Sequence, residues 1–342
     1  MDRSMPTLLP PHLPETLREL RGDPRGSLAR AIHHLRVYSR DLAGPPSAGQ
    51  PLERVIYGMA QPLLGARVLL REPDLLIESL KPALLLGAVC ALVALASPHE
   101  GPLWLGRLKR FYQTFAVLAP LPSVLFAKHY ARLAALVRWR LGFGACGPRE
   151  YPLGTSIRRV VEQALIVAIG AAPFLLIPSL IPFAGKALVA TLLGLWGMHW
   201  VVVDAFDDAR VLRPGENLRA AEAEDRAAPS PWFVRWFKLA ADRLELLPKV
   251  PLVSLVPRVL RRFAGFCDKI ALPWRGEIAI MEAHPMLSLG FSITTAVLLA
   301  TPGLNLLFRP IIIVASAHLL GHLEADEGAV QEHGESLPAP SA

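Results

Sequence analysis

The chain of 342 residues has few charged side chains and few aromatic ones. Charged residues make up 19% of it, against about 25% in an ordinary soluble domain. Hydrophobic residues make up 52%, the mean hydropathy is +0.37, and aromatic residues are only 7%, so aliphatic side chains supply most of the apolarity. This balance excludes a wholly disordered chain and indicates an integral membrane protein.

Cysteine is also scarce. Cys90, Cys146 and Cys267 lie too far apart for a redox or zinc pair, and their odd number argues against a disulfide scaffold. The common enzyme signatures, GxSxG, the P-loop and HExxH, are missing. His318 and His322 share a helix face, but no acidic residue accompanies them at the spacing of a zinc site. We therefore expect no enzyme activity, no bound metal and no cofactor.

The chain carries a positive net charge. The formal charge is +7 and the isoelectric point is near 9.6, which is typical of proteins that bind nucleic acid or anionic lipid. The basic residues flank apolar runs, and no nucleic-acid-binding signature is present. The sequence therefore predicts a lipid bilayer as the partner, and no nucleic acid.

Two uncharged runs predict a transmembrane hairpin over 82–136. Lys81 and His99 enclose 17 uncharged residues, and Arg110 and Lys128 enclose another 17. A bilayer core of about 30 Å needs about 20 residues, with a lower limit near 17. Prolines in the second run predict a kink there.

Two further apolar regions are interrupted by Pro and Gly. The region 160–205 contains Pro173, Pro178 and Pro182, and the region 283–323 contains Pro302-Gly303 and Asn305. We interpret both as half-penetrating helical hairpins that form a weak internal repeat. Interrupted apolar segments in corresponding places are typical of a transport site.

The remaining segments complete the predicted organisation. The fold class expected is an all-α integral membrane protein with two transmembrane helices, two half-penetrating hairpins and amphipathic surface helices. The chain begins with an N-terminal arm (1–50) that contains an amphipathic helix over 27–42, followed by a membrane domain (51–206) that opens with an amphipathic surface helix over 51–80. A polar, basic-aromatic insert (207–282) comes next, with a loop over 216–231 and amphipathic helices over 232–247 and 252–270. The second hairpin (283–323) and a disordered tail (324–342) follow.

A few polar residues near the apolar segments are candidate ligands for a small anion. Arg67 and Arg71 share one helix face, and Lys186 and Arg309 follow the turns of the two interrupted hairpins. A charge at membrane depth is costly, and therefore marks a functional candidate. The alternative is that these cations anchor helices to lipid phosphates. Asn305 either caps a turn or contacts the ligand.

Three acidic residues end the apolar run before the insert. We expect Asp204, Asp207 and Asp208 to mark the exit of a helix into water.

Several stretches resemble one membrane family. They are Ile177 to Gly185 with the later Trp196 and Val203-Asp204, the run from Thr301 to Ile311, Gly65-Ala66-Arg67, and the prolines Pro73 and Pro82. Together they resemble the family of the CysZ sulfate permease and the etoposide-induced membrane proteins, over about 60–206 and 283–322. The resemblance implies a bacterial inner-membrane protein with two long helices and two half-penetrating hairpins. It also implies sulfate uptake, but Leu76 and Ile77 stand where such permeases carry their sulfate-binding arginine pair.

These observations leave two functions open. The first is a channel or permease for a small solute or anion, with sulfate itself disfavoured. The alternative is a non-transporting membrane organiser whose insert binds lipid or a partner protein. We expect a multi-pass location in a bacterial inner membrane and a homo-oligomer. A soluble helical protein is the remote third option.

Overall fold

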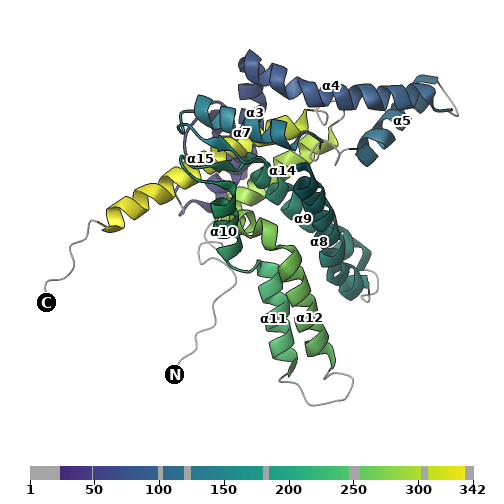
Figure 1. Ribbon diagram of the computed structural model, residues 1–342, viewed down its shortest axis with the longest axis vertical. Helices are drawn as coiled ribbons and strands as arrows, with labels where there is room; N and C mark the ends of the chain where they lie inside the picture. The colour runs from purple at the N-terminus through teal and green to yellow at the C-terminus, as the bar shows by residue number, and fades with distance from the viewer. Residues whose placement is uncertain are drawn as a thin grey trace.

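The computed structural model describes residues 24–47, 49–98, 103–118, 125–179, 185–245, 255–301 and 307–335. Within these ranges the protein is mostly helical, with one two-stranded antiparallel sheet (Figure 1). The elements are α2 (Pro24–Tyr38), α3 (Pro51–Arg71), α4 (Pro73–Ala96), α5 (Leu103–Leu118), α7 (Ala127–Arg140), β1 (Gly147–Pro148), α8 (Leu153–Ser179), α9 (Gly185–Ala209), β2 (Val211–Leu212), α10 (Leu218–Ala227), α11 (Trp232–Glu245), α12 (Leu255–Ile270), η1 (Leu272–Trp274), α13 (Arg275–Ala283), α14 (Pro285–Ala300) and α15 (Phe308–Glu335).

Helix α3 forms the centre of the body, packed against α14 and α15. Glycines let the helices approach closely: a Cβ on Gly58 or Gly290 would lie 2.1 or 1.9 Å from a backbone oxygen of the facing helix. A buried hydrogen bond of 2.8 Å between Gln61 Oε1 and His318 Nδ1 joins α3 to α15. The stretch expected as a surface helix over 51–80 is therefore two helices, of which the first is a core element.

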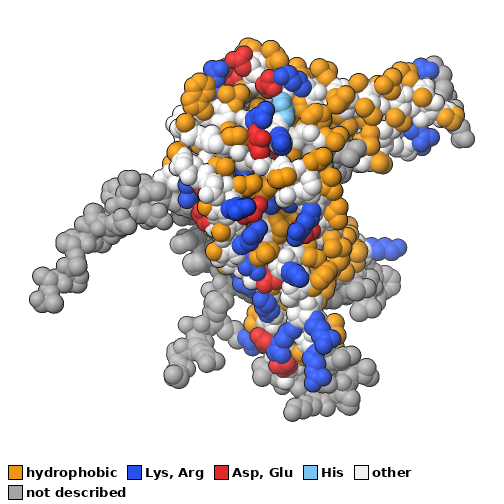
Figure 2. Space-filling model, viewed as in Figure 1, with side chains coloured by type: hydrophobic (Ala, Val, Ile, Leu, Met, Phe, Trp, Pro, Cys, Tyr) orange, Lys and Arg blue, Asp and Glu red, His pale blue; other side chains and the backbone are white. Residues whose placement is uncertain are grey.

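Three helical pairs extend from this body, one to the side and two towards the bottom of the view in Figure 1. They are α4 with α5, α8 with α9, and α11 with α12. Figure 2 shows hydrophobic side chains spread over the α4–α5 arm, where exposed residues such as Leu84, Leu92 and Trp104 are 66%, 66% and 68% accessible. An apolar surface of this extent is typical of contact with lipid or with another protein.

Two of the described helices, α4 and α9, are long and apolar enough to cross a membrane. Helix α4 starts at Pro73, about two and a half helical turns before the predicted start at 82. Of the second predicted span, 111–127, α5 covers the residues to Leu118, 119–124 are not described, and a separate helix, α7, begins at Ala127. The kink expected at Pro120 and Pro122 lies outside the described residues. The second candidate span is instead α9, within the region predicted to be a half-penetrating hairpin.

Other segments also differ from expectation. Helix α8 continues through Pro173 and Pro178 to Ser179, so neither proline interrupts it. The predicted loop over 216–231 contains α10, whose first turn is capped by the Asn217 side chain accepting from the Ala220 N–H at 2.9 Å. The tail predicted to be disordered from 324 continues as α15 to Glu335. Helices α11 and α12 lie where the two amphipathic helices of the insert were predicted.

Candidate functional site

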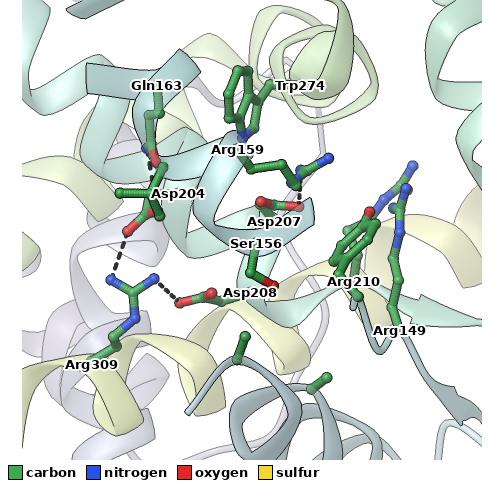
Figure 3. A pocket seen from close by; sticks show the side chains of 14 residues that line it. Arg149, Ser156, Arg159, Gln163, Asp204, Asp207, Asp208, Arg210, Trp274 and Arg309 are labelled. Carbon is green, nitrogen blue, oxygen red and sulfur yellow. Dashed lines mark hydrogen bonds and ion pairs between the residues drawn. The ribbon is translucent and has the colours of Figure 1, made fainter. Parts of the chain in front are cut away.

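Ion pairs gather where the C-terminal end of α9 meets α8 and α15. Asp204, Asp207 and Asp208 lie three and four residues apart, so one side of α9 presents all three carboxylates. Arg309, in the first turn of α15, lies 3.0 Å from Asp204 and 2.7 Å from Asp208. Arg159 of α8 donates to Asp207 at 2.7 Å (Figure 3). These carboxylates do not mark a simple exit into water, because each is paired with an arginine.

The pairs continue into the insert. Arg149 and Arg210 both donate to Asp225 of α10, and both face Glu277 of α13, at 3.7 and 3.4 Å. Gly276 is required beside them, since a Cβ there would lie 2.2 Å from an Asp225 carboxylate oxygen. The insert is thus held by charge to the segment between α7 and α8.

A further arginine connects this group to the middle of α15. Arg138 of α7, only 2% exposed, forms a forked pair with Glu324 at 2.8 and 3.0 Å. Arg210 lies 3.9 Å from the same carboxylate. We call the five arginines 138, 149, 159, 210 and 309 and the six acids 204, 207, 208, 225, 277 and 324 the arginine–carboxylate network.

The network has six carboxylates and five arginines, so one carboxylate is in excess. Among the six, Glu277 has the most unusual surroundings. Its side chain is fully buried, and no hydrogen-bond donor reaches either carboxylate oxygen within the described residues. Burial raises the pKa of Glu277 to about 7, with the negative charge of Asp225 acting in the same direction and Arg210 opposing it. The network can therefore take up a proton near neutral pH.

Two small polar cavities border the network. The first, about 60 Å³, lies between the α8–α9 pair and α15 and is lined by Arg309, Asp204, Asp208 and Gln163, among other residues (Figure 3). Its volume suits a few water molecules. The second, about 120 Å³, lies towards α10. Arg149 and Arg159 form part of the wall of both, so the two cavities are neighbours.

The predicted ligand residues do not meet at one place. Arg309 is 8% exposed and lines the first cavity. Lys186 is exposed at the start of α9, whereas the carboxylates that pair with Arg309 stand at that helix's end. Arg67 is partly buried and Arg71 is exposed on α3, and neither borders the two cavities. Asn305 lies outside the described residues.

The histidines have structural surroundings. The His199 ring stacks on Trp196 with centroids 5.6 Å apart, and His318 bonds Gln61. The rings of His318 and His322 are 4.7 Å apart. In the part of the chain that the structure describes, no three His, Cys, Asp or Glu side chains are arranged to hold a metal ion.

Sequence reasoning found Arg309 and Asp204 but missed most of the network. Arg149, Arg159 and Arg210 are ordinary arginines at the ends of helices or in loops, and nothing local indicates their burial. The available signal was the run of arginines directly bordering the apolar regions, which we attributed to lipid contact.

Comparison with known proteins gives no match: no family model, curated protein or solved structure is significantly similar to this chain.

Proposed function

We propose that this chain is an integral membrane protein that lets a small solute cross a bilayer, in keeping with its resemblance to the CysZ-like permeases. One observation carries the proposal: Arg309, at the start of α15, and Asp204 and Asp208, at the end of α9, line a cavity between α15 and the α8–α9 pair. Ionisable groups in such a place mark solute paths in membrane proteins. We further propose a bacterial inner membrane as the location.

The charges around the cavity limit what could pass. Arg309 already has two carboxylate partners, so an anion must displace Asp204 or Asp208 to bind it. A doubly charged sulfate would need a second free cation, and the positions of the family's arginine pair hold Leu76 and Ile77. We therefore favour a small, singly charged anion or a proton over sulfate.

The test is ion flux into liposomes that carry the purified protein. Chloride, sulfate and proton flux are compared for the unaltered chain, Asp208→Asn, Arg309→Gln and the control Lys186→Gln. Asp208→Asn leaves Arg309 with one partner and should increase anion flux, while Arg309→Gln should abolish it. Lys186→Gln should leave flux unchanged, because Lys186 is exposed and remote from the network.

A helical circular-dichroism spectrum and a single size-exclusion peak establish that each variant is folded. Protein that is folded and inserted but passes none of the three ions would refute the transport proposal.

A second candidate is a membrane organiser that transports nothing. The observation in its favour is that each of the five network arginines has a carboxylate partner. On this reading the network only fixes the insert to the hairpins, and the insert binds lipid or a partner protein. Folded protein without flux, whose stability falls when the network is altered, would support it.

A further inference from the structure

The outer face of α12 carries an apolar stripe that is only about half covered by the rest of the described structure. Val256, Val259 and Phe266 are 43%, 55% and 45% exposed. At 100° per residue they lie within a narrow sector of the helix. Single exposed apolar side chains are common on protein surfaces, whereas a row of them requires an explanation.

Packing inside the protein accounts for the adjacent face of α12. Ala264 and Cys267 of α12 are buried, and Phe263 meets Phe237 of α11 with ring centroids 5.1 Å apart. This inner face holds the two helices together as a hairpin. The outer stripe is the border of this packed face, because Phe263 lies in the same sector of the helix, but its own three side chains stay about half exposed.

Basic residues flank the outer stripe. Arg258, Arg262 and Lys269 are exposed, lie together on one side of it, and form no ion pair within the described residues. This contrasts with Arg261 on the same helix, which donates twice to Glu245 at 2.6 Å. It contrasts also with the network arginines, each of which is neutralised. The positive charge of these three residues is therefore free to attract an anionic surface.

We propose that the outer face of α12 binds the anionic head-group surface of a lipid bilayer. Apolar side chains beside Lys and Arg on one helix face are the pattern of helices that lie in the membrane interface. The exposed Trp236 on neighbouring α11 adds an aromatic ring of the type enriched at that depth. Figure 2 shows Lys and Arg side chains gathered on this hairpin.

The α11–α12 hairpin projects from the body beside the α8–α9 pair, which α12 contacts, and away from the α4–α5 arm (Figure 1). The inference rests on the membrane location that we propose for the chain, but it does not require transport. It assigns the insert a role of its own, as an arm that senses or holds anionic lipid.

The experiment uses the full chain in lipid nanodiscs with a fluorescent reporter on α12. Gly265 is exposed, and a Cβ there meets no atom within 4 Å, so Gly265→Cys places a dye without removing any proposed contact. Cys146→Ser removes the partly exposed thiol, while Cys90 and Cys267 are buried. The reporter is an environment-sensitive dye, read in phosphatidylcholine discs and in discs that also contain phosphatidylglycerol.

The test variant replaces the three unpaired basic residues by glutamine. The control variant loses the same charge at three exposed arginines that each have a carboxylate partner: Arg132, Arg158 and Arg213. Each basic residue near an anionic surface contributes about 1 kcal/mol, so three should change the ratio of docked to undocked arm about a hundredfold.

We expect the dye to move to an apolar environment only when phosphatidylglycerol is present, in the unaltered chain and in the control variant. The test variant should stay at the undocked signal. Equal signals in both lipids, or equal docking of test and control variants, would overturn the inference. A response to soluble heparin without one to phosphatidylglycerol would overturn it in favour of a soluble polyanion. Failure of the chain to enter nanodiscs would instead refute the membrane location itself.

Discussion

Replacing Glu277 by glutamine isolates the energetic cost of the surplus carboxylate in the network. Because the pKa of Glu277 is raised from 4.5 to about 7, the folded protein holds this proton more tightly than the unfolded chain does. The stability that this provides is complete below about pH 4.5 and is lost as the pH rises through about 7. Glutamine has the shape of the protonated side chain but cannot ionise.

The magnitude follows from the shift. A difference of 2.5 between the two pKa values, at about 1.4 kcal/mol per unit, corresponds to a loss of about 3 kcal/mol above neutral pH. An unfolding entropy of about 2.1 cal/mol/K per residue over 342 residues gives about 0.7 kcal/mol/K. Glu277→Gln should therefore melt at the same temperature as the unaltered chain at about pH 5, and about 4 °C higher at about pH 8.

Thermal melting in detergent, followed by circular dichroism across this pH range, is the measurement. The exposed Asp74 provides the control, because Asp74→Asn should leave the pH dependence of the melting temperature unchanged. If Glu277→Gln lowered the melting temperature at alkaline pH, the attraction of Arg149 and Arg210 would outweigh burial. The argument for a protonated network would then fail.

Three further predictions concern packing, capping and reactivity. Gly290→Ala should destabilise the protein by about 1–3 kcal/mol, because the new Cβ would collide with the backbone of α3. The control Gly87→Ala, whose Cβ would meet no atom within 4 Å, should be neutral or stabilising, and thermal melting of the two variants tests the difference. Asn217→Ala should cost about 1 kcal/mol and increase amide exchange in the first turn of α10, and equal exchange would contradict the cap. Cys146 should react with maleimide faster than Cys267, whose pKa burial raises to about 11; equal labelling would show that the insert opens.

The helical class and the approximate position of the first candidate span followed from the sequence, because charge-free runs and helix-length apolar segments are local properties. The second span did not. Counting uncharged residues favoured 111–127, whereas α9 is longer and ends in Asp204, Asp207 and Asp208. A count of uncharged residues stops at the first acidic residue, but a helix can continue past that residue when its carboxylate is paired with an arginine.

The arginine–carboxylate network was unpredictable for a related reason. Arg309 was singled out because it stands in an apolar region, yet its partners lie 105 residues away in the sequence. Arg149 meets Asp225 over 76 residues. No periodicity or motif relates such positions, since only the folded arrangement of α8, α9, α10 and α15 brings them together.

The Arg138–Glu324 pair can form only after both residues have been synthesised. Arg138 leaves the ribosome 186 residues before its carboxylate partner. Before Glu324 is synthesised, the Arg138 guanidinium, 2% exposed in the folded protein, has to remain hydrated or pair with another carboxylate. Closure of the body around α15 by this pair therefore cannot precede the synthesis of Glu324.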